Sequence, residues 1–166
     1  KAILAVNLYG ASADYDNILK IAKKHKLKVI EDNAQAPGAL YQGKFTGTIG
    51  DIGIFSFNVH KAIQSGEGGM LLPNNDRYAW RAQLFRNHGE AVMDDLADDP
   101  KTKLELLAGN NFRLTEIQAA IMIEQLKKLA RLNKTRIALA DYLTQRIKNF
   151  SWLQGACVLP KSSCVY

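Results

Sequence analysis

The stretch AILAVNLYGASADYDNILKIAKKHKLKVIED, residues 2–32, decides the fold that this sequence predicts. Alanine, isoleucine, leucine and valine dominate residues 2–8, and this run ends at Tyr9-Gly10. A second apolar run occupies residues 27–30. Short continuous apolar runs are typical of strands that are buried on both faces of a parallel sheet. Because the segment between them has helical spacing, we predict a β-α-β unit with a right-handed crossover.

The helix of this unit has recognisable end signals. Asp14 is a candidate N-cap, and Asp16 adds negative charge to the first turn. The residues that follow at helical spacing are Ile18, Ile21, Ala22 and His25. Three lysines lie within residues 23–26, near the expected C-terminal end, so the charges match the helix dipole.

The middle of the chain predicts two further strands, at residues 52–57 and 69–72. Between the second and third strands, residues 37–50 hold four glycines and a proline. That composition indicates a loop or a short hairpin around Gln42-Gly43.

Two helices are predicted in the second half. The first runs from Asp76 to about Arg86, and residues 89–110, which have little periodicity, are interpreted as a loop. The second begins at the capping box Thr115-Glu116-Ile117-Gln118 and continues to about Lys148. Its apolar stripe consists of Leu126, Leu129, Leu132, Ala140, Leu143 and Ile147. A helix this long is unusual inside one compact domain, so we expect it to link two domains.

The bulk composition is that of a water-soluble globular protein, with 166 residues, 47% hydrophobic and 23% charged. No stretch approaches the roughly 18 apolar residues that span a membrane, and no secretory leader is visible. The net charge is +6, but the basic residues follow helical patterns without interleaved aromatic residues. We therefore favour solvated helix faces over a nucleic-acid surface, and an anionic small substrate fits the charge equally well.

The chain has two cysteines, Cys157 and Cys164, which form no metal-ligand pattern. So few cysteines favour a reducing cytoplasm, with a single disulfide left open. The chain begins at Lys1 and ends at Val165-Tyr166 within sequence patterns, so we expect an internal piece of a longer protein.

Polar residues follow two of the predicted strands. Asp32 comes directly after the second strand, at the sheet edge where ligands bind in α/β proteins. Ser56 lies in the third strand, and Lys61 follows it by five residues. A carboxylate pairs with a protonated pyridine nitrogen, and a lysine amine binds an aldehyde. Pyridoxal phosphate (PLP) requires both groups, so the combination predicts a PLP site.

Each of these residues also has a plainer interpretation when taken alone. Asp32 can cap a turn, Gln35 can be an ordinary loop residue, and Lys61 can be a solvated charge. The Ser56 hydroxyl, opposite its aromatic neighbours, can face either a cleft or a backbone carbonyl. His60, a histidine without a visible partner residue, is interpreted as a packing residue.

Three further motifs surround these positions. Gly66-Glu67-Gly68-Gly69 lacks the strand-then-helix context of a phosphate loop, so we interpret it as a turn into the next strand. Arg86-Asn87-His88-Gly89 predicts a helix end with Gly89 in the left-handed conformation. Asn111-Phe112-Arg113 precedes the long helix and suits either helix capping or anion binding.

Taken together, these motifs resemble the DegT/DnrJ/StrS family of PLP-dependent nucleotide-sugar aminotransferases. The matching motifs are Leu8-Tyr9-Gly10, Asp32-x-x-Gln35, Ser56, Lys61, Gly66-Glu67-Gly68-Gly69, Arg86-Asn87-His88-Gly89 and Asn111-Phe112-Arg113-Leu114-x-Glu116-Ile117-Gln118-Ala119-Ala120. The resemblance covers about residues 5–130. It implies the central part of the large domain of the aspartate-aminotransferase-like type I fold, a mostly parallel sheet with flanking helices, followed by an interdomain helix. Residues 1–125 then belong to the large domain, and residues 126–166 form the interdomain helix and the start of the small domain.

The resemblance also implies residue roles. Lys61 is the lysine that binds the cofactor aldehyde and moves protons. Asp32 pairs with the pyridine nitrogen, Gln35 lies near the ring, and Ser56 binds the phosphate. Asn111 reaches the cofactor phosphate of a neighbouring subunit, since the family forms homodimers with shared active sites, and Arg113 supports that loop. The implied reactants are a nucleotide-linked keto-sugar and glutamate or glutamine.

Some positions depart from the common family pattern, and they leave alternatives. Pro37 often has a histidine in its place, Asn33 an alanine, and Asn110 an aromatic residue. Relatives with histidine at the lysine position are sugar dehydratases, but here Lys61 occupies that position. A PLP-dependent dehydratase, an aminotransferase of a cyclitol or other non-nucleotide ketone, and a non-catalytic regulatory protein on the same fold are the alternatives.

Overall fold

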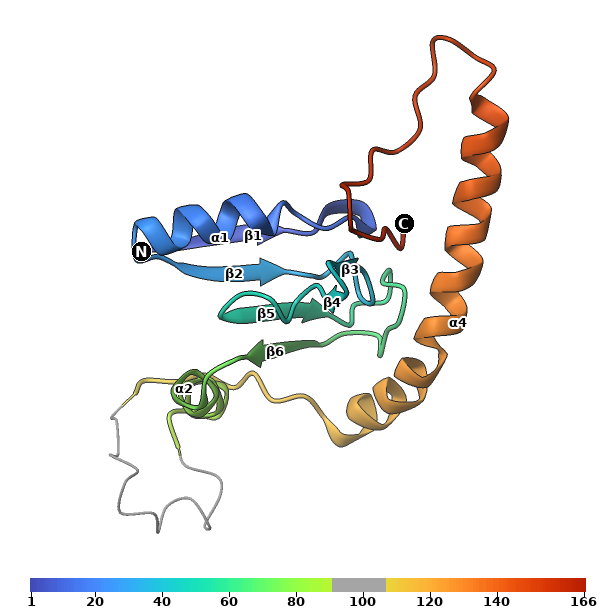
Figure 1. The fold of residues 1–166 in the computed structure, drawn as a ribbon. Helices are drawn as coiled ribbons and strands as arrows, with labels where there is room; N and C mark the ends of the chain where they lie inside the picture. Colours follow the sequence, from blue (N-terminus) through green and yellow to red (C-terminus); the bar gives the residue numbers. More distant parts are fainter. Residues whose placement is uncertain (91–106) are drawn as a thin grey trace.

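The computed structural model describes residues 1–90 and 107–166, and a four-stranded sheet lies at its centre. The strand order is β1-β2-β5-β6, in which β1, β2 and β5 are parallel and β6 is antiparallel to β5 (Figure 1). The bounds are Ala2–Val6 for β1, Lys28–Asp32 for β2, Ile52–Ser56 for β5 and Gly69–Pro73 for β6. The predicted strands and the mostly parallel α/β sheet are therefore confirmed.

The first strand is shorter than the apolar run predicted. It ends at Val6, and a short 3-10 turn, η1 (Leu8–Gly10), follows. Tyr9 in this turn has a left-handed backbone, with φ of 51° and ψ of 36°. Asn7, between the strand and the turn, is fully buried. A polar residue inside the apolar run thus ends the strand.

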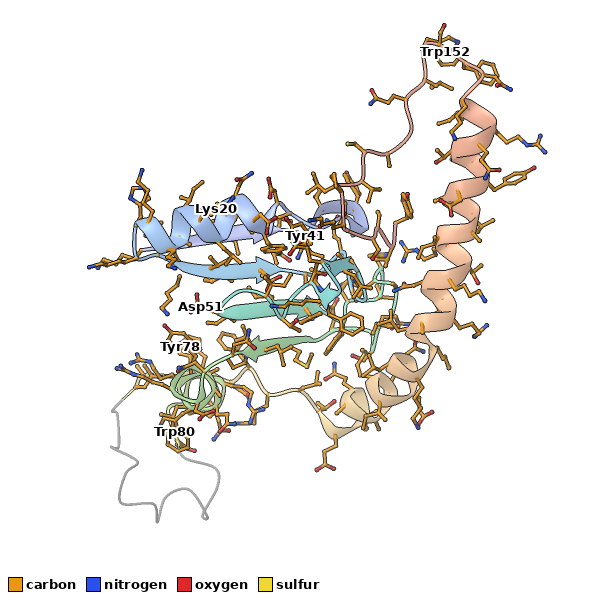
Figure 2. The ribbon with its side chains drawn as sticks, in the orientation of Figure 1. Lys20, Tyr41, Asp51, Tyr78, Trp80 and Trp152 are labelled. Carbon is orange, nitrogen blue, oxygen red and sulfur yellow. The ribbon has the colours of Figure 1, made fainter. Side chains whose placement is uncertain are left out.

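The helix α1 (Tyr15–Lys24) joins β1 to β2 and covers one face of the sheet. Asp14 caps it as predicted, because its side chain accepts a hydrogen bond from the Asn17 N–H. The helix ends one residue earlier than the apolar spacing suggested, with His25 as its C-cap. Tyr15 is fully buried and packs edge to face on Tyr41, with ring centroids 5.6 Å apart (Figure 2).

The two faces of the sheet differ in their burial. Val29 and Glu31 of β2 face the α1 side and are fully or almost fully buried. The alternate residues Ile30 and Asp32 face the other side and are only half-buried. Leu4, which pairs with Ile30 across β1 and β2, is 59% exposed. Asp32 therefore belongs to the more open face.

An ion pair closes the amino end of β2, opposite the end that carries Asp32. Lys28 Nζ lies 2.8 Å from Asp51 Oδ1 and 5.7 Å from the centre of the Tyr78 ring (Figure 2). Burial raises the pKa of the Asp51 carboxyl, but the hydrogen bonds from Lys28 and the Val29 N–H outweigh burial and lower it. This pair stabilises the sheet edge that lies away from the predicted site.

Two short strands, β3 (Leu40–Tyr41) and β4 (Lys44–Phe45), form the predicted hairpin around Gln42-Gly43. Both turn residues have positive φ, 51° for Gln42 and 78° for Gly43, as a tight two-residue hairpin turn requires. The hairpin lies beyond the carboxyl end of β2 (Figure 1).

The helix α2 (Asp76–Arg86) follows β6 at the predicted position. Its N-cap is Asn75, and the chain leaves its C-terminal end through His88 and Gly89, which have φ of 58° and 82°. The left-handed Gly89 is thus confirmed. Most of the loop predicted at residues 89–110 lies outside the described residues.

The long helix α4 (Glu116–Ile147) has 32 residues, which corresponds to roughly 48 Å of length. The predicted capping box is confirmed, because Thr115 and Gln118 bond each other's backbone N–H groups. Leu129 and Leu132 pack against the core, whereas Leu126 and Leu143 are each 60% exposed. Only part of the predicted stripe is therefore buried, and α4 runs past the carboxyl ends of the parallel strands, transverse to the strand direction (Figure 1).

The chain returns to the sheet after α4. Val165 N–H donates to Gly10 O at 3.0 Å, and Ser163 N–H donates to Leu40 O at 2.8 Å. Val165 is buried with Ala36 and Ala39. The predicted division into two domains at residue 125 stays a prediction. Among the described residues, no helix is long and apolar enough to cross a membrane.

Candidate functional site

Asp32 and Ser56 share one face at the carboxyl ends of neighbouring parallel strands. In the register of β2 and β5, Asp32 lies opposite Ile54. Ser56 is two residues beyond Ile54, so its side chain points to the same face as that of Asp32. Ligands of open α/β sheets bind at this edge.

The Asp32 carboxylate is held by its own turn. Its Oδ1 accepts a hydrogen bond from the Ala34 N–H at 3.0 Å. Its main-chain oxygen accepts one from the Asn7 N–H at 2.9 Å, across to the end of β1. Within the described part of the chain, Oδ2 has no hydrogen-bond partner. The half-buried carboxylate is thus fixed through one oxygen and free to bind through the other.

Gln35 joins the ends of β1 and β2. Its Oε1 accepts a hydrogen bond from the Tyr9 N–H at 2.8 Å. This contact turns the amide oxygen toward the left-handed turn η1 and leaves both amide protons available. Because Gln35 is exposed and only three residues beyond Asp32, its NH2 group can serve a ligand at the same edge.

Lys61 lies on a compact loop that leaves this edge after Ser56. Lys61 N–H donates to Asn58 O at 2.9 Å, and Ser65 N–H donates back to Phe57 O at 3.0 Å. The Ser56 Oγ accepts only a long hydrogen bond, 3.4 Å, from the Asn58 N–H. Lys61 is half-buried, and no ion pair involves it among residues 1–90 and 107–166.

Two features next to Lys61, His60 and the glycine-rich motif, both belong to turns. The His60 side chain is exposed, and its main-chain N–H donates to Asn58 Oδ1 at 3.0 Å. His60 is therefore a turn residue and not the packing residue expected. Gly66 and Gly68 have φ of 86° and 145° and lead into β6. The glycine-rich motif is therefore a turn, as predicted.

Asn111 lies apart from Asp32 and Ser56. Its backbone forms a β-bridge with Asn87 at the end of α2, beyond the edge strand β6. The Arg113 guanidinium donates to Asn87 Oδ1 at 2.6 Å, so Arg113 does support this loop. Thr115, not Asn111, caps α4. Since Asn111 is exposed and the resemblance assigns it to a neighbouring subunit, its cofactor role stays a prediction.

A buried polar cluster that the sequence did not reveal lies beneath the site. Glu31 is fully buried and accepts backbone N–H bonds from Gly47 at 2.7 Å and from Ile49 and Gly50 at 2.5 Å each. Burial, together with the nearby Glu31 carboxylate, raises the pKa of the Tyr15 phenol.

The same cluster continues through two buried amides. Tyr15 OH donates to Asn7 Oδ1 at 2.8 Å, and Asn7 Nδ2 donates to Asn33 Oδ1 at 3.0 Å. Asn33 Nδ2 donates to Thr46 O at 3.0 Å. The only signal in the sequence is that Asn7, Glu31 and Asn33 are polar residues within or beside apolar runs. Their partners lie far along the chain.

A cavity of about 480 Å³ lies between the end of the sheet and the first half of α4. Ser56, Asn33 and Thr46 are among the lining residues, and the lining surface is almost entirely apolar. Phe57 and Met122 bring the sheet and α4 sides together in one core cluster. Asp32, Gln35 and Lys61 are not among the lining residues, so this cavity lies beside the predicted cofactor residues and not among them.

Comparison with known proteins identifies relatives of this chain. The sequence pattern of the DegT/DnrJ/EryC1/StrS aminotransferase family matches residues 1–163. A GDP-perosamine synthase of Caulobacter vibrioides is 44% identical over 130 residues, which are 78% of this chain and 33% of the relative. The chain thus spans about a third of that relative's length.

Solved structures show the same fold. The aminotransferase from Psychrobacter cryohalolentis superposes with a TM-score of 0.89 and 32% identity, over 100% of this chain and 45% of the neighbour. An E. coli GDP-4-keto-6-deoxy-D-mannose-3-dehydratase with bound hydrated PLP superposes with a TM-score of 0.84 and 31% identity, over 99% of this chain and 45% of that protein.

Proposed function

We propose, because the chain belongs to the DegT/DnrJ/EryC1/StrS aminotransferase family, that the whole protein is a PLP-dependent aminotransferase. The observation that carries the proposal is the register that places Asp32 and Ser56 on one face of the carboxyl edge. Gln35 and Lys61 lie on the two loops that leave this edge. These four residues supply the carboxylate, hydroxyl, amide and amine that the cofactor requires.

The contacts within the chain leave these groups available to PLP. Within residues 1–90 and 107–166, Asp32 keeps one carboxylate oxygen without a partner, and Gln35 keeps both amide protons. In the same part of the chain, the Ser56 hydroxyl makes only a long contact through its oxygen, so its proton is free to be donated to a phosphate. The chemistry of this donor set therefore fits PLP, which acts as an electron sink when it is bound.

Each residue then has a defined task. The Asp32 carboxylate pairs with a protonated ring nitrogen and stabilises its positive charge. The Ser56 hydroxyl donates a hydrogen bond to the phosphate. Lys61 holds the cofactor through its amine and moves protons between cofactor and substrate carbons. Asn111 serves the cofactor phosphate of a neighbouring subunit in a homodimer with shared active sites.

The proposed reaction transfers an amino group from glutamate or glutamine to a nucleotide-linked keto-sugar, in the biosynthesis of an amino-deoxysugar. The similarity to a GDP-perosamine synthase supports this substrate class. The net charge of +6 suits a nucleotide-linked substrate. A cytoplasmic location follows from this choice of substrate.

A sugar dehydratase is the second candidate, because one such enzyme shares the fold with a TM-score of 0.84. The lysine at position 61 favours amino transfer, since the resemblance associates dehydratases with histidine at that position. His60 does not substitute for it, because it is exposed and one residue earlier in the turn.

The test uses the full-length protein with PLP, nitrogen-labelled glutamate and a nucleotide-linked keto-sugar. We expect visible absorption by bound PLP, transfer of the label to the sugar, and loss of transfer in Lys61→Ala. The matched control is Lys44→Ala, which removes an exposed lysine on β4 and should leave transfer unchanged. Unchanged transfer in Lys61→Ala, or a product without the label, would refute the proposal.

A further inference from the structure

Asn33, the residue directly after Asp32, is fully buried and is bonded in three directions. Its main-chain N–H donates to Ile54 O on β5 at 2.8 Å. Its side-chain Oδ1 accepts from Asn7 Nδ2 at the end of β1, and its Nδ2 donates to Thr46 O, each at 3.0 Å. One residue thus ties together the carboxyl ends of three parallel strands and the loop after the hairpin.

The bonds of Asn33 hold the two sides of the turn that carries Asp32 and Gln35, without touching either of these side chains. On one side, Asn7 bonds both residues. Its main-chain N–H donates to Asp32 O, and its side-chain Nδ2 donates to Asn33 Oδ1. On the other side, Thr46 is buried, and its hydroxyl lies 3.2 Å from Ala36 O and 3.3 Å from Ala39 O. These bonds fix the loop that follows Gln35.

We propose that Asn33 is a positioning residue that fixes the Asp32–Gln35 turn and thereby the direction of the Asp32 carboxylate at the cofactor site. The inference rests on the proposed PLP function, but Asn33 itself does not contact the cofactor. Without the Asn33 side chain, this turn keeps only its main-chain bonds and the bond from the Ala34 N–H to Asp32 Oδ1. The carboxylate then samples more directions and binds the ring nitrogen less well.

The test is Asn33→Ala in the full-length protein, with Asn74→Ala as the matched control. Asn74 Nδ2 also donates to two backbone carbonyls of the loop before β5, those of Thr48 at 3.1 Å and Gly50 at 2.7 Å. Asn74 lies at the opposite end of the strands, next to the end of β6. Each variant loses two amide hydrogen bonds, but only the bonds of Asn33 lie next to Asp32.

We expect Asn33→Ala to raise the Kd for PLP about five- to tenfold, because part of the cost of its two lost hydrogen bonds falls on the contact between Asp32 and the cofactor. The pH at which the visible absorption of the bound cofactor changes should also shift, because Asp32 faces the ring less directly. Asn74→Ala should lower thermal stability by about as much as Asn33→Ala does, but leave the Kd for PLP and the pH of the absorption change unchanged. A Kd for Asn33→Ala equal to that of wild type would overturn the inference.

Two outcomes are distinguished by the same measurements. If wild type itself binds no PLP, the proposed function fails. If wild type binds PLP and Asn33→Ala binds it equally well, only the positioning role fails. Should Asn33→Ala not fold, Asn33→Ser retains a polar group in the same space, and the same rise in Kd is expected. An unchanged Kd there overturns the inference as well.

Discussion

Replacing Glu31 with glutamine is expected to lower the free energy of unfolding by about 2–4 kcal/mol, because a buried carboxylate with three backbone donors loses its charge. The substitution keeps the size and shape of the side chain. It changes only the chemistry of the oxygen that faces Gly47, or of the oxygen that faces Ile49 and Gly50. No packing change therefore contributes to the result.

The magnitude follows from the three hydrogen bonds. In the better orientation, the new amide oxygen keeps the bonds from Ile49 and Gly50, and the NH2 group faces the Gly47 N–H. One bond to a charged group is then lost, which costs about 1.5–3 kcal/mol, and the other two weaken by about 1 kcal/mol each. Removal of the buried charge also removes its desolvation cost, which offsets part of the loss.

The assay is urea unfolding of the full-length protein, followed by far-ultraviolet circular dichroism. We expect a lower midpoint with an unchanged slope, which indicates lost stability without a change in the surface exposed on unfolding. Glu124→Gln is the control, because Glu124 is exposed on α4 and its partner is the equally exposed Lys127. A Glu31→Gln protein with the wild-type midpoint would show that these three bonds do not stabilise the loop.

Two further predictions concern the same core. Burial and the Glu31 carboxylate raise the pKa of Tyr15 above its ordinary value of 10.0. Above pH 10 the unfolded chain therefore loses this proton before the folded protein does, and wild type loses stability as the pH rises. The urea midpoint of Tyr15→Phe should fall less steeply with pH than that of wild type, and parallel profiles would contradict the assignment. Gly53→Ala places a Cβ 2.0 Å from Gly47 O and should cost about 1–3 kcal/mol or more. Gly43→Ala has nothing within 4 Å and adds only the strain of an alanine at φ of 78°, so it should lower the melting temperature less, and equal shifts would argue against the close contact.

Much of the fold could be predicted because its signals are local. The apolar runs of β1 and β2, the Asp14 cap and the Thr115 capping box each depend on residues within a few positions of one another. The hairpin turn at Gln42-Gly43 is equally local. The exposed half of the α4 stripe could not be predicted, because helical spacing indicates an apolar face but not whether anything covers it.

The candidate site was predictable only in part. Asp32, Gln35, Ser56 and Lys61 were predicted from their types, their intervals and the family resemblance, and the register puts Asp32 and Ser56 on one face; their cofactor roles stay a prediction. Glu31, Asn7 and Asn33 were missed because their partners are distant in sequence, up to 26 residues away for the Asn7–Asn33 bond. A buried polar residue is recognisable only once the groups that satisfy it have been located in space.

The return of the last residues to η1 has a consequence for the order of folding during synthesis. The contact between the Cys164 Sγ and Tyr9 O joins positions 155 residues apart, and Val165 bonds Gly10 beside it. The β-α-β unit of residues 2–32 can form from nearby contacts soon after it is translated, because local contacts form fastest. The turn that holds Tyr9 against Gln35 is completed only after residue 165 has been made. Within this unit, the η1 turn therefore reaches its final set of contacts later than the strands and the helix on either side of it.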